Sequence, residues 1–161
     1  MPIKKDEKGI GLIEVIAAFS ISIVVITALV SLALYTMRSS LNSKLLLEGT
    51  KIASREIERV RALRDTSVSW PIFLSAVDGS SGPNCLNTNP CHMSETPFAA
   101  ISGVSPVEMI DNQAVTRFFT ITRDSNDPDN IVRVAVSVNW SVGGIEKNTH
   151  VYTDLTNWQP R

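Results

Sequence analysis

The sequence predicts an α+β fold in which a long N-terminal helix packs on a small antiparallel sheet of three to four strands. No proline lies between Pro2 and Pro71, and much of this stretch is apolar. The last third of the chain instead alternates apolar and polar residues with the period of a β-strand. One face of such a sheet needs a cover, and the helix carries the only long apolar stripe that can supply it.

The first part of the helix, residues 10–37, has the length of a membrane span. Residues 15–37 carry no charge, and 23 residues at ~1.5 Å each extend about 35 Å, enough for a ~30 Å hydrocarbon core. Lysines at positions 4, 5 and 8 favour a cytoplasmic N-terminus with the bulk of the chain outside. A removed secretory signal is disfavoured, since its apolar core is about 7–15 residues and ends at a small-residue cleavage site.

The second part of the helix, residues 38–65, is predicted to be amphipathic. Its apolar residues recur mostly three or four positions apart, as they do on one face of a helix. Glu58 and Arg61 are spaced to form an ion pair. Gly49 interrupts the pattern and marks a candidate bend.

The remaining residues, 66–161, are expected to form a globular head. Residues 66–113 contain five of the eight prolines and many Ser and Asn, which predicts loops with at most short strands or a helical turn. Three aromatic residues in this region should still pack against apolar surface: Trp70, Phe73 and Phe98.

Residues 114–158 are predicted to form a β-meander. Apolar residues alternate from Val132 to Trp140, which indicates a strand with one buried face. A strand at 114–123 precedes it, with Arg117 and Arg123 breaking the apolar phase. The turn at 127–130 and the Gly-Gly pair at 143–144 should join the three strands, and a fourth strand could come from the loop region.

Cys85 and Cys91 are the only cysteines and lie in the proline-rich segment. A disulfide between them is favoured if the head is exported. Free thiols and a metal site that includes His92 are the alternatives, although this spacing matches no zinc pattern.

Composition and motifs disfavour several classes of function. A net charge of -1 gives no basic excess for nucleic acid, and we expect no direct binding to it. The sequence has no phosphate-binding glycine loop, no paired metal carboxylates and no G-x-S-x-G. We therefore expect a non-enzymatic protein without a cofactor or metal, and we interpret His150 as a surface residue of the last strand.

Glu14 is the residue that the apolar helix does not explain. An ionised carboxylate at the centre of a membrane helix costs roughly 2.5–3.5 kcal/mol on insertion scales. Ionisable residues inside a membrane segment are therefore functional candidates, and each needs a partner. A partner amine near Glu14 would exist only if the leader, residues 1–9, were removed.

The segment Gly9-Ile10-Gly11-Leu12-Ile13-Glu14-Val15, preceded by lysines and followed by a long apolar helix, resembles the N-terminus of type IV pilins and type II secretion pseudopilins. The resemblance implies cleavage between Gly9 and Ile10 by a prepilin peptidase and methylation of the new amino terminus at Ile10. It matches Glu14 to the family's acidic residue. Ile10 and Gly11 depart from the common Phe or Met and Thr or Ser, which suggests a divergent or minor member.

Membership would imply a pilin-like fold and a structural role in a type IV pilus or secretion pseudopilus. The expected partners are other pilin or pseudopilin subunits, the prepilin peptidase, the inner-membrane assembly platform and membrane lipid. The chain would cross the inner membrane once and later enter a filament on the periplasmic or extracellular side. In our hypothesis, Glu14 pairs with the amine of a neighbouring subunit and fixes register. The alternative is a membrane-tethered binding or sensor domain whose anchor is never cleaved.

Overall fold

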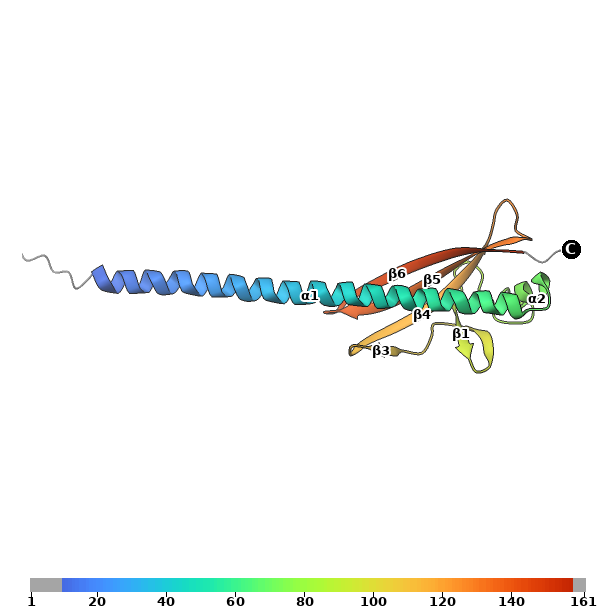
Figure 1. The fold of residues 1–161 in the computed structure, drawn as a ribbon, viewed down its shortest axis with the longest axis horizontal. Coiled ribbons are helices and arrows are strands. Elements are labelled where there is room, and N and C mark those ends of the chain that lie inside the picture. Colours follow the sequence, from blue (N-terminus) through green and yellow to red (C-terminus); the bar gives the residue numbers. More distant parts are fainter. Residues whose placement is uncertain (1–9, 158–161) are drawn as a thin grey trace, which may run out of the picture. The chain divides into compact units, whose positions relative to one another are not determined.

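The computed structural model describes residues 10–157. Its elements in chain order are α1 (Ile10–Thr66), α2 (Trp70–Ser75), β1 (Cys91–Glu95), β2 (Phe98–Ser102), β3 (Glu108–Ile110), β4 (Gln113–Arg123), β5 (Ile131–Val142) and β6 (Ile145–Thr156) (Figure 1). The chain divides into two compact units between Leu41 and Asn42, each of which is described by itself below.

Helix α1 is continuous over 57 residues and ends one residue after the predicted position. It passes through Gly49 without a break, so the structure gives this glycine a packing role. A Cβ added at Gly49 would lie 3.0 Å from the indole ring of Trp140 and 3.2 Å from the side chain of Thr149. The absent side chain therefore lets β5 and β6 approach the helix closely.

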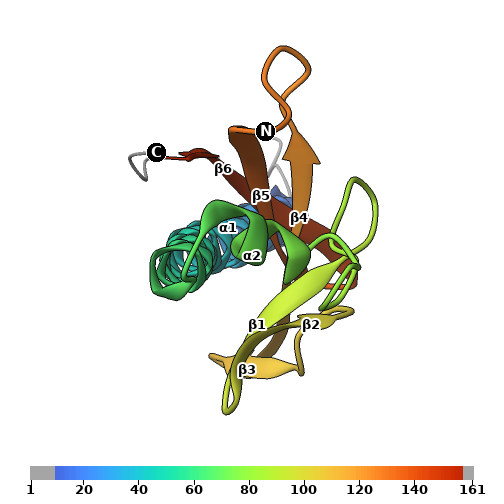
Figure 2. The same ribbon diagram turned by 90° about the vertical axis from the view of Figure 1, so that its right-hand side faces the viewer.

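All the strands pair in one antiparallel sheet of six, with the order β2-β1-β4-β5-β6 and with β3 paired to β4. The α+β class is confirmed, but the predicted count of three to four strands is wrong. The extra strands β1, β2 and β3 lie within the region predicted as loops, together with the short helix α2 (Figure 2). They have five, five and three residues, too few for their alternation to stand out among prolines and glycines.

The predicted meander is confirmed over the part of residues 114–158 that the structure describes; Trp158 lies outside it. β4 pairs with β5 from Val115↔Trp140 to Arg123↔Val132, and β5 pairs with β6 along its whole length. Gly143 and Gly144 form the tight turn between β5 and β6 with φ of +61° and +80°. Both values lie in the left-handed region that glycine tolerates, which explains the Gly-Gly pair.

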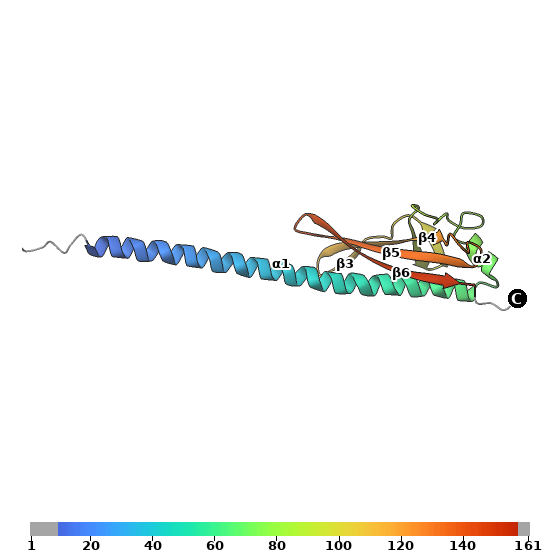
Figure 3. The same cartoon turned by 90° about the horizontal axis from the view of Figure 1, so that it is seen from above.

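The core of the head lies between the sheet and the part of α1 that follows Asn42, which runs beside β5 and β6 in Figure 3. The alternating residues of β5 supply one side of it, as predicted. The helix supplies the other through residues that recur three or four apart: Leu45, Ile52, Ala53, Ile57 and Val60.

The aromatic residues of the 66–113 region do not all pack as predicted. Trp70 and Phe73 are buried, and the Nε1–H of Trp70 donates to the carbonyl oxygen of Asp129 at 2.5 Å, which ties α2 to the β4–β5 connection. Phe98 is 43% exposed, so its predicted burial is wrong. It begins β2, an edge strand that pairs only with β1 among the described strands.

Candidate functional site

The N-terminal unit presents an apolar helical surface. Every described side chain from residue 11 to 40 is exposed, including large ones such as Ile13, Phe19 and Tyr35 at about 70%. This helix is long and apolar enough to cross a membrane. Since nothing in the described part of the chain covers these residues, their surroundings must be lipid or other protein if they are to leave water.

Five hydroxyl groups of this segment form hydrogen bonds within the helix itself. Each donates to a backbone carbonyl three or four residues earlier at 2.8 Å. The donors are Ser20, Ser22, Thr27, Ser31 and Thr36. Because each of these five hydroxyls has a backbone acceptor in its own helix, these five residues are compatible with an apolar environment.

Glu14 lies on this surface, in α1, with its side chain exposed. It is four residues after Ile10, so the two lie about one helical turn apart. The helix includes Ile10, but the structure does not describe its side chain, and the leader with Gly9 lies outside the described residues. The proposed cleavage junction therefore remains a prediction from the sequence.

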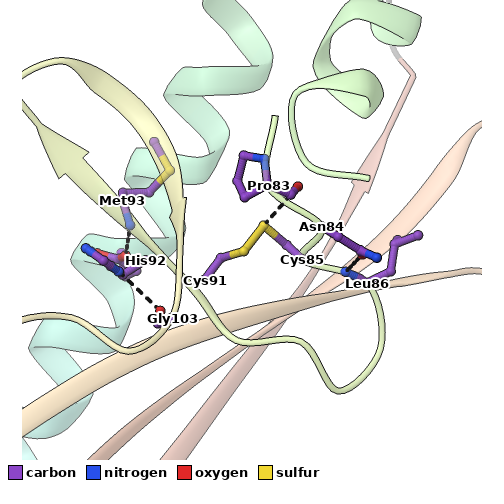
Figure 4. The surroundings of a disulfide bond; sticks show 9 residues. Pro83, Asn84, Cys85, Leu86, Cys91, His92, Met93 and Gly103 are labelled. Carbon is purple, nitrogen blue, oxygen red and sulfur yellow. Dashed lines mark hydrogen bonds between the residues drawn. A yellow bond between two sulfur atoms is a disulfide. The ribbon is translucent and has the colours of Figure 1, made fainter. Parts of the chain in front are cut away.

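The predicted cysteine pair forms a disulfide, with a Cα–Cα distance of 5.5 Å and both residues fully buried (Figure 4). His92, which follows Cys91, turns to Gly103, and its Nδ1 lies 3.2 Å from that carbonyl oxygen. Among the described residues, no group of three or more His, Cys, Asp or Glu could hold a metal ion. The disulfide is thus the form that the structure supports.

A buried charged cluster is the feature that the sequence reasoning missed. Glu56 is fully buried between α1 and the sheet. Its carboxylate accepts the backbone N–H of Met93 at 2.6 Å and the Nε–H of Arg117 at 2.9 Å, and Arg59 Nη1 lies 3.6 Å away. Two signals in the sequence point to it: Glu56 falls within the apolar stripe of the helix, and Arg117 breaks the apolar phase of β4.

Exposed ion pairs lie on the surface of the head. The predicted Glu58–Arg61 pair is confirmed at 2.6 Å. Lys44 Nζ lies 2.5 Å from Asp111 in the β3–β4 turn, and the hydrogen bond and charge of Asp111 raise the pKa of Lys44. His150 is exposed on β6, as predicted, and its Nδ1 lies 2.8 Å from the Ser137 hydroxyl.

Comparison with known proteins yields no match to this chain among family models, curated proteins or solved structures.

Proposed function

We propose that this protein is a structural subunit, a minor pilin or pseudopilin, of a type IV pilus or a type II secretion-like pseudopilus. The observation that carries the proposal is Glu14. It is the only charged residue from position 10 to 37 and lies on a helical surface that is otherwise apolar and exposed. A plain membrane anchor has no use for this carboxylate, whereas an assembling helix does.

The register hypothesis assigns Glu14 its role. Cleavage between Gly9 and Ile10 creates an amine, and methylation of that amine at Ile10 preserves its positive charge. In a bundle of staggered helices, the amine of one subunit neutralises Glu14 of its neighbour. A misaligned helix leaves both charges buried and unpaired, which is costly, so the pair favours one register.

The remaining parts of the chain fit the same role. The apolar part of α1 first resides in the inner membrane among lipids, with the N-terminus cytoplasmic and the head outside. It then moves into the filament among other pilin or pseudopilin subunits. The prepilin peptidase and the inner-membrane assembly platform act on the chain, which contributes no catalysis.

Mass spectrometry of the mature N-terminus tests the processing step. We expect a chain that starts at N-methylated Ile10 in cells with an active prepilin peptidase, and an unprocessed start in cells where that peptidase is inactivated. A chain that still begins at Met1 or Pro2 in the first strain would contradict the proposal. It would favour the alternative, a tethered binding or sensor domain with an uncleaved anchor.

Glu14→Gln tests the assembly step. The variant should be cleaved normally and keep its head disulfide, but should co-purify with other pilin subunits far less than the unmodified chain. Glu58→Gln is a matched control, because it removes an exposed carboxylate from the same helix outside the apolar segment. Equal co-assembly of both variants would refute the role assigned to Glu14.

A further inference from the structure

A cleft of about 290 Å³ opens on the head beside the buried charged cluster. Three arginine side chains line it: Arg55 and Arg59, one turn apart on α1, and Arg117 from β4. Arg59 and Arg117 are only 17% and 13% exposed, so their positions are fixed by packing. The cleft therefore has a mostly buried cationic floor and a half-exposed cation, Arg55, at its rim.

The floor of the cleft contains one carboxylate, that of Glu56, which packing and hydrogen bonds hold in place. Glu56 is fully buried, and its hydrogen bonds to Met93 and Arg117 hold it in place. It balances one of the three positive charges. The other two must be balanced by groups at the mouth of the cleft.

Those two groups are exposed glutamates. Glu95, 75% exposed, pairs with Arg59, and Glu108, 41% exposed, pairs with Arg117 at 3.1 Å and with Arg55 at 3.4 Å. Exposed ion pairs contribute little, so either glutamate can be displaced at small cost. Arg59 Nη1 faces inward, 3.6 Å from Glu56 and without a hydrogen-bond acceptor among the described residues, so the guanidinium reaches Glu95 at the cleft through Nη2.

The guanidinium groups and the charge balance of the cleft favour a carboxylate as the ligand. A guanidinium group binds a carboxylate through two parallel hydrogen bonds. Displacing one glutamate frees a single positive charge, which matches a monoanionic carboxylate better than a doubly charged phosphate. The wall beside the arginines is apolar and includes Pro106 and Val107, the latter 60% exposed. Two more exposed apolar residues, Val104 and Met109, lie close to them in sequence.

We propose that this cleft is a docking site for another polypeptide chain, which inserts an acidic side chain flanked by apolar residues. The incoming carboxylate replaces Glu95, the more exposed of the two glutamates, on Arg59, and the flanking residues cover the Pro106–Val107 wall. The site lies wholly within the head and requires neither cleavage at Gly9 nor a filament. If this docking site were disproved, the proposed function would therefore still stand. If the proposed function were disproved, the docking site would still stand.

The test uses the full chain in detergent micelles, with NMR of the arginine side chains as the readout. The probes are a capped Val-Glu-Val peptide, its Val-Gln-Val analogue, acetate and phosphate. We expect the Glu peptide to shift the Arg59 and Arg117 resonances at the lowest concentration and the Gln peptide to leave them unchanged. Equal binding of acetate would overturn docking of a polypeptide, equal binding of phosphate would overturn carboxylate selectivity, and no binding would overturn the site.

Three exposed positions provide the variants. Glu95→Gln removes the internal competitor and should tighten binding of the Glu peptide about two- to fivefold, the range expected from one exposed ion pair. Arg55→Gln should weaken it by a similar factor. Glu58→Gln, which changes an exposed carboxylate on the same helix outside the cleft, should have no effect. If Glu95→Gln and Glu58→Gln behave alike, the exchange proposed here does not occur.

Discussion

At the scale of single residues, Gly49 sets the distance between α1 and the sheet. Gly49→Val should lower the free energy of unfolding by about 1–3 kcal/mol, because the added branches must displace the ring of Trp140. Gly49→Ala should cost less, since better helix propensity returns up to ~1 kcal/mol. Denaturant titration of the full chain in detergent, followed by tryptophan fluorescence, measures both. Gly11→Val is the control, because an added Cβ there meets nothing within 4 Å. Equal stability of the valine variants would contradict this packing role.

Substitution of Glu56 should lower the free energy of unfolding strongly. Glu56→Gln removes the buried carboxylate that pairs with Arg117 Nε, and breaking one partner of a buried ion pair typically costs about 3–5 kcal/mol. The matched variant Glu58→Gln, two residues away and exposed, should change stability by less than about 0.5 kcal/mol. Thermal unfolding followed by circular dichroism distinguishes them. A Glu56→Gln protein as stable as Glu58→Gln would show that the cluster is not structural.

At the scale of elements, the disulfide holds β1 to the rest of the sheet. β1 pairs with β4 through Cys91↔Phe119 alone, and the disulfide adds a covalent link from β1 to Cys85, whose carbonyl oxygen accepts the backbone N–H of Ile121 in β4. Closing a loop with a sequence separation of 6 should stabilise the fold by about 2–2.5 kcal/mol in the chain-entropy treatment. Comparing denaturant unfolding with and without reductant measures this difference. Identical midpoints, with reduction verified by mass spectrometry, would contradict it.

The loop that precedes the disulfide is attached to β4 by Asp78 and Arg123, 3.1 Å apart. Burial raises the pKa of Asp78, but hydrogen bonds from Ser80 and the charge of Arg123 outweigh it, and the net pKa is lowered. A lowered folded-state pKa gives stability that is present above the ordinary value of 3.8 and lost as pH falls through the folded-state value. Asp78→Asn should therefore destabilise the protein at pH 7, and the difference should shrink as the pH falls below the ordinary value of 3.8. A difference that persists unchanged to about pH 2 would contradict the assignment.

At the scale of the whole molecule, long periodic segments were predictable and short ones were not. The helix and the Val132–Trp140 strand repeat their pattern often enough to identify both the element and its buried face. Strands of three to five residues, such as β3, repeat it once or twice, and their pairing depends on distant partners. The cluster around Glu56 required knowing which turn of α1 faces Arg117, and only the three-dimensional packing supplies that. Glu14, by contrast, is conspicuous in the sequence because its neighbours are apolar on all sides.

The division of the chain at Leu41 leads to a last prediction, about which part is self-sufficient. The described core residues all lie in the second unit, beginning at Leu45. A chain that begins at Asn42 should therefore fold in water without detergent and form the Cys85–Cys91 disulfide. A chain that begins at Ser54 is the control: it lacks Leu45 and Ile52, buried residues that each contribute about 2–5 kcal/mol, a large share of the typical 5–15 kcal/mol of a domain. The control should be unfolded by circular dichroism and by amide dispersion in NMR spectra. If the Asn42 chain were also unfolded, the head would need the apolar part of α1 to fold, and the N-terminal segment would have a structural role besides assembly.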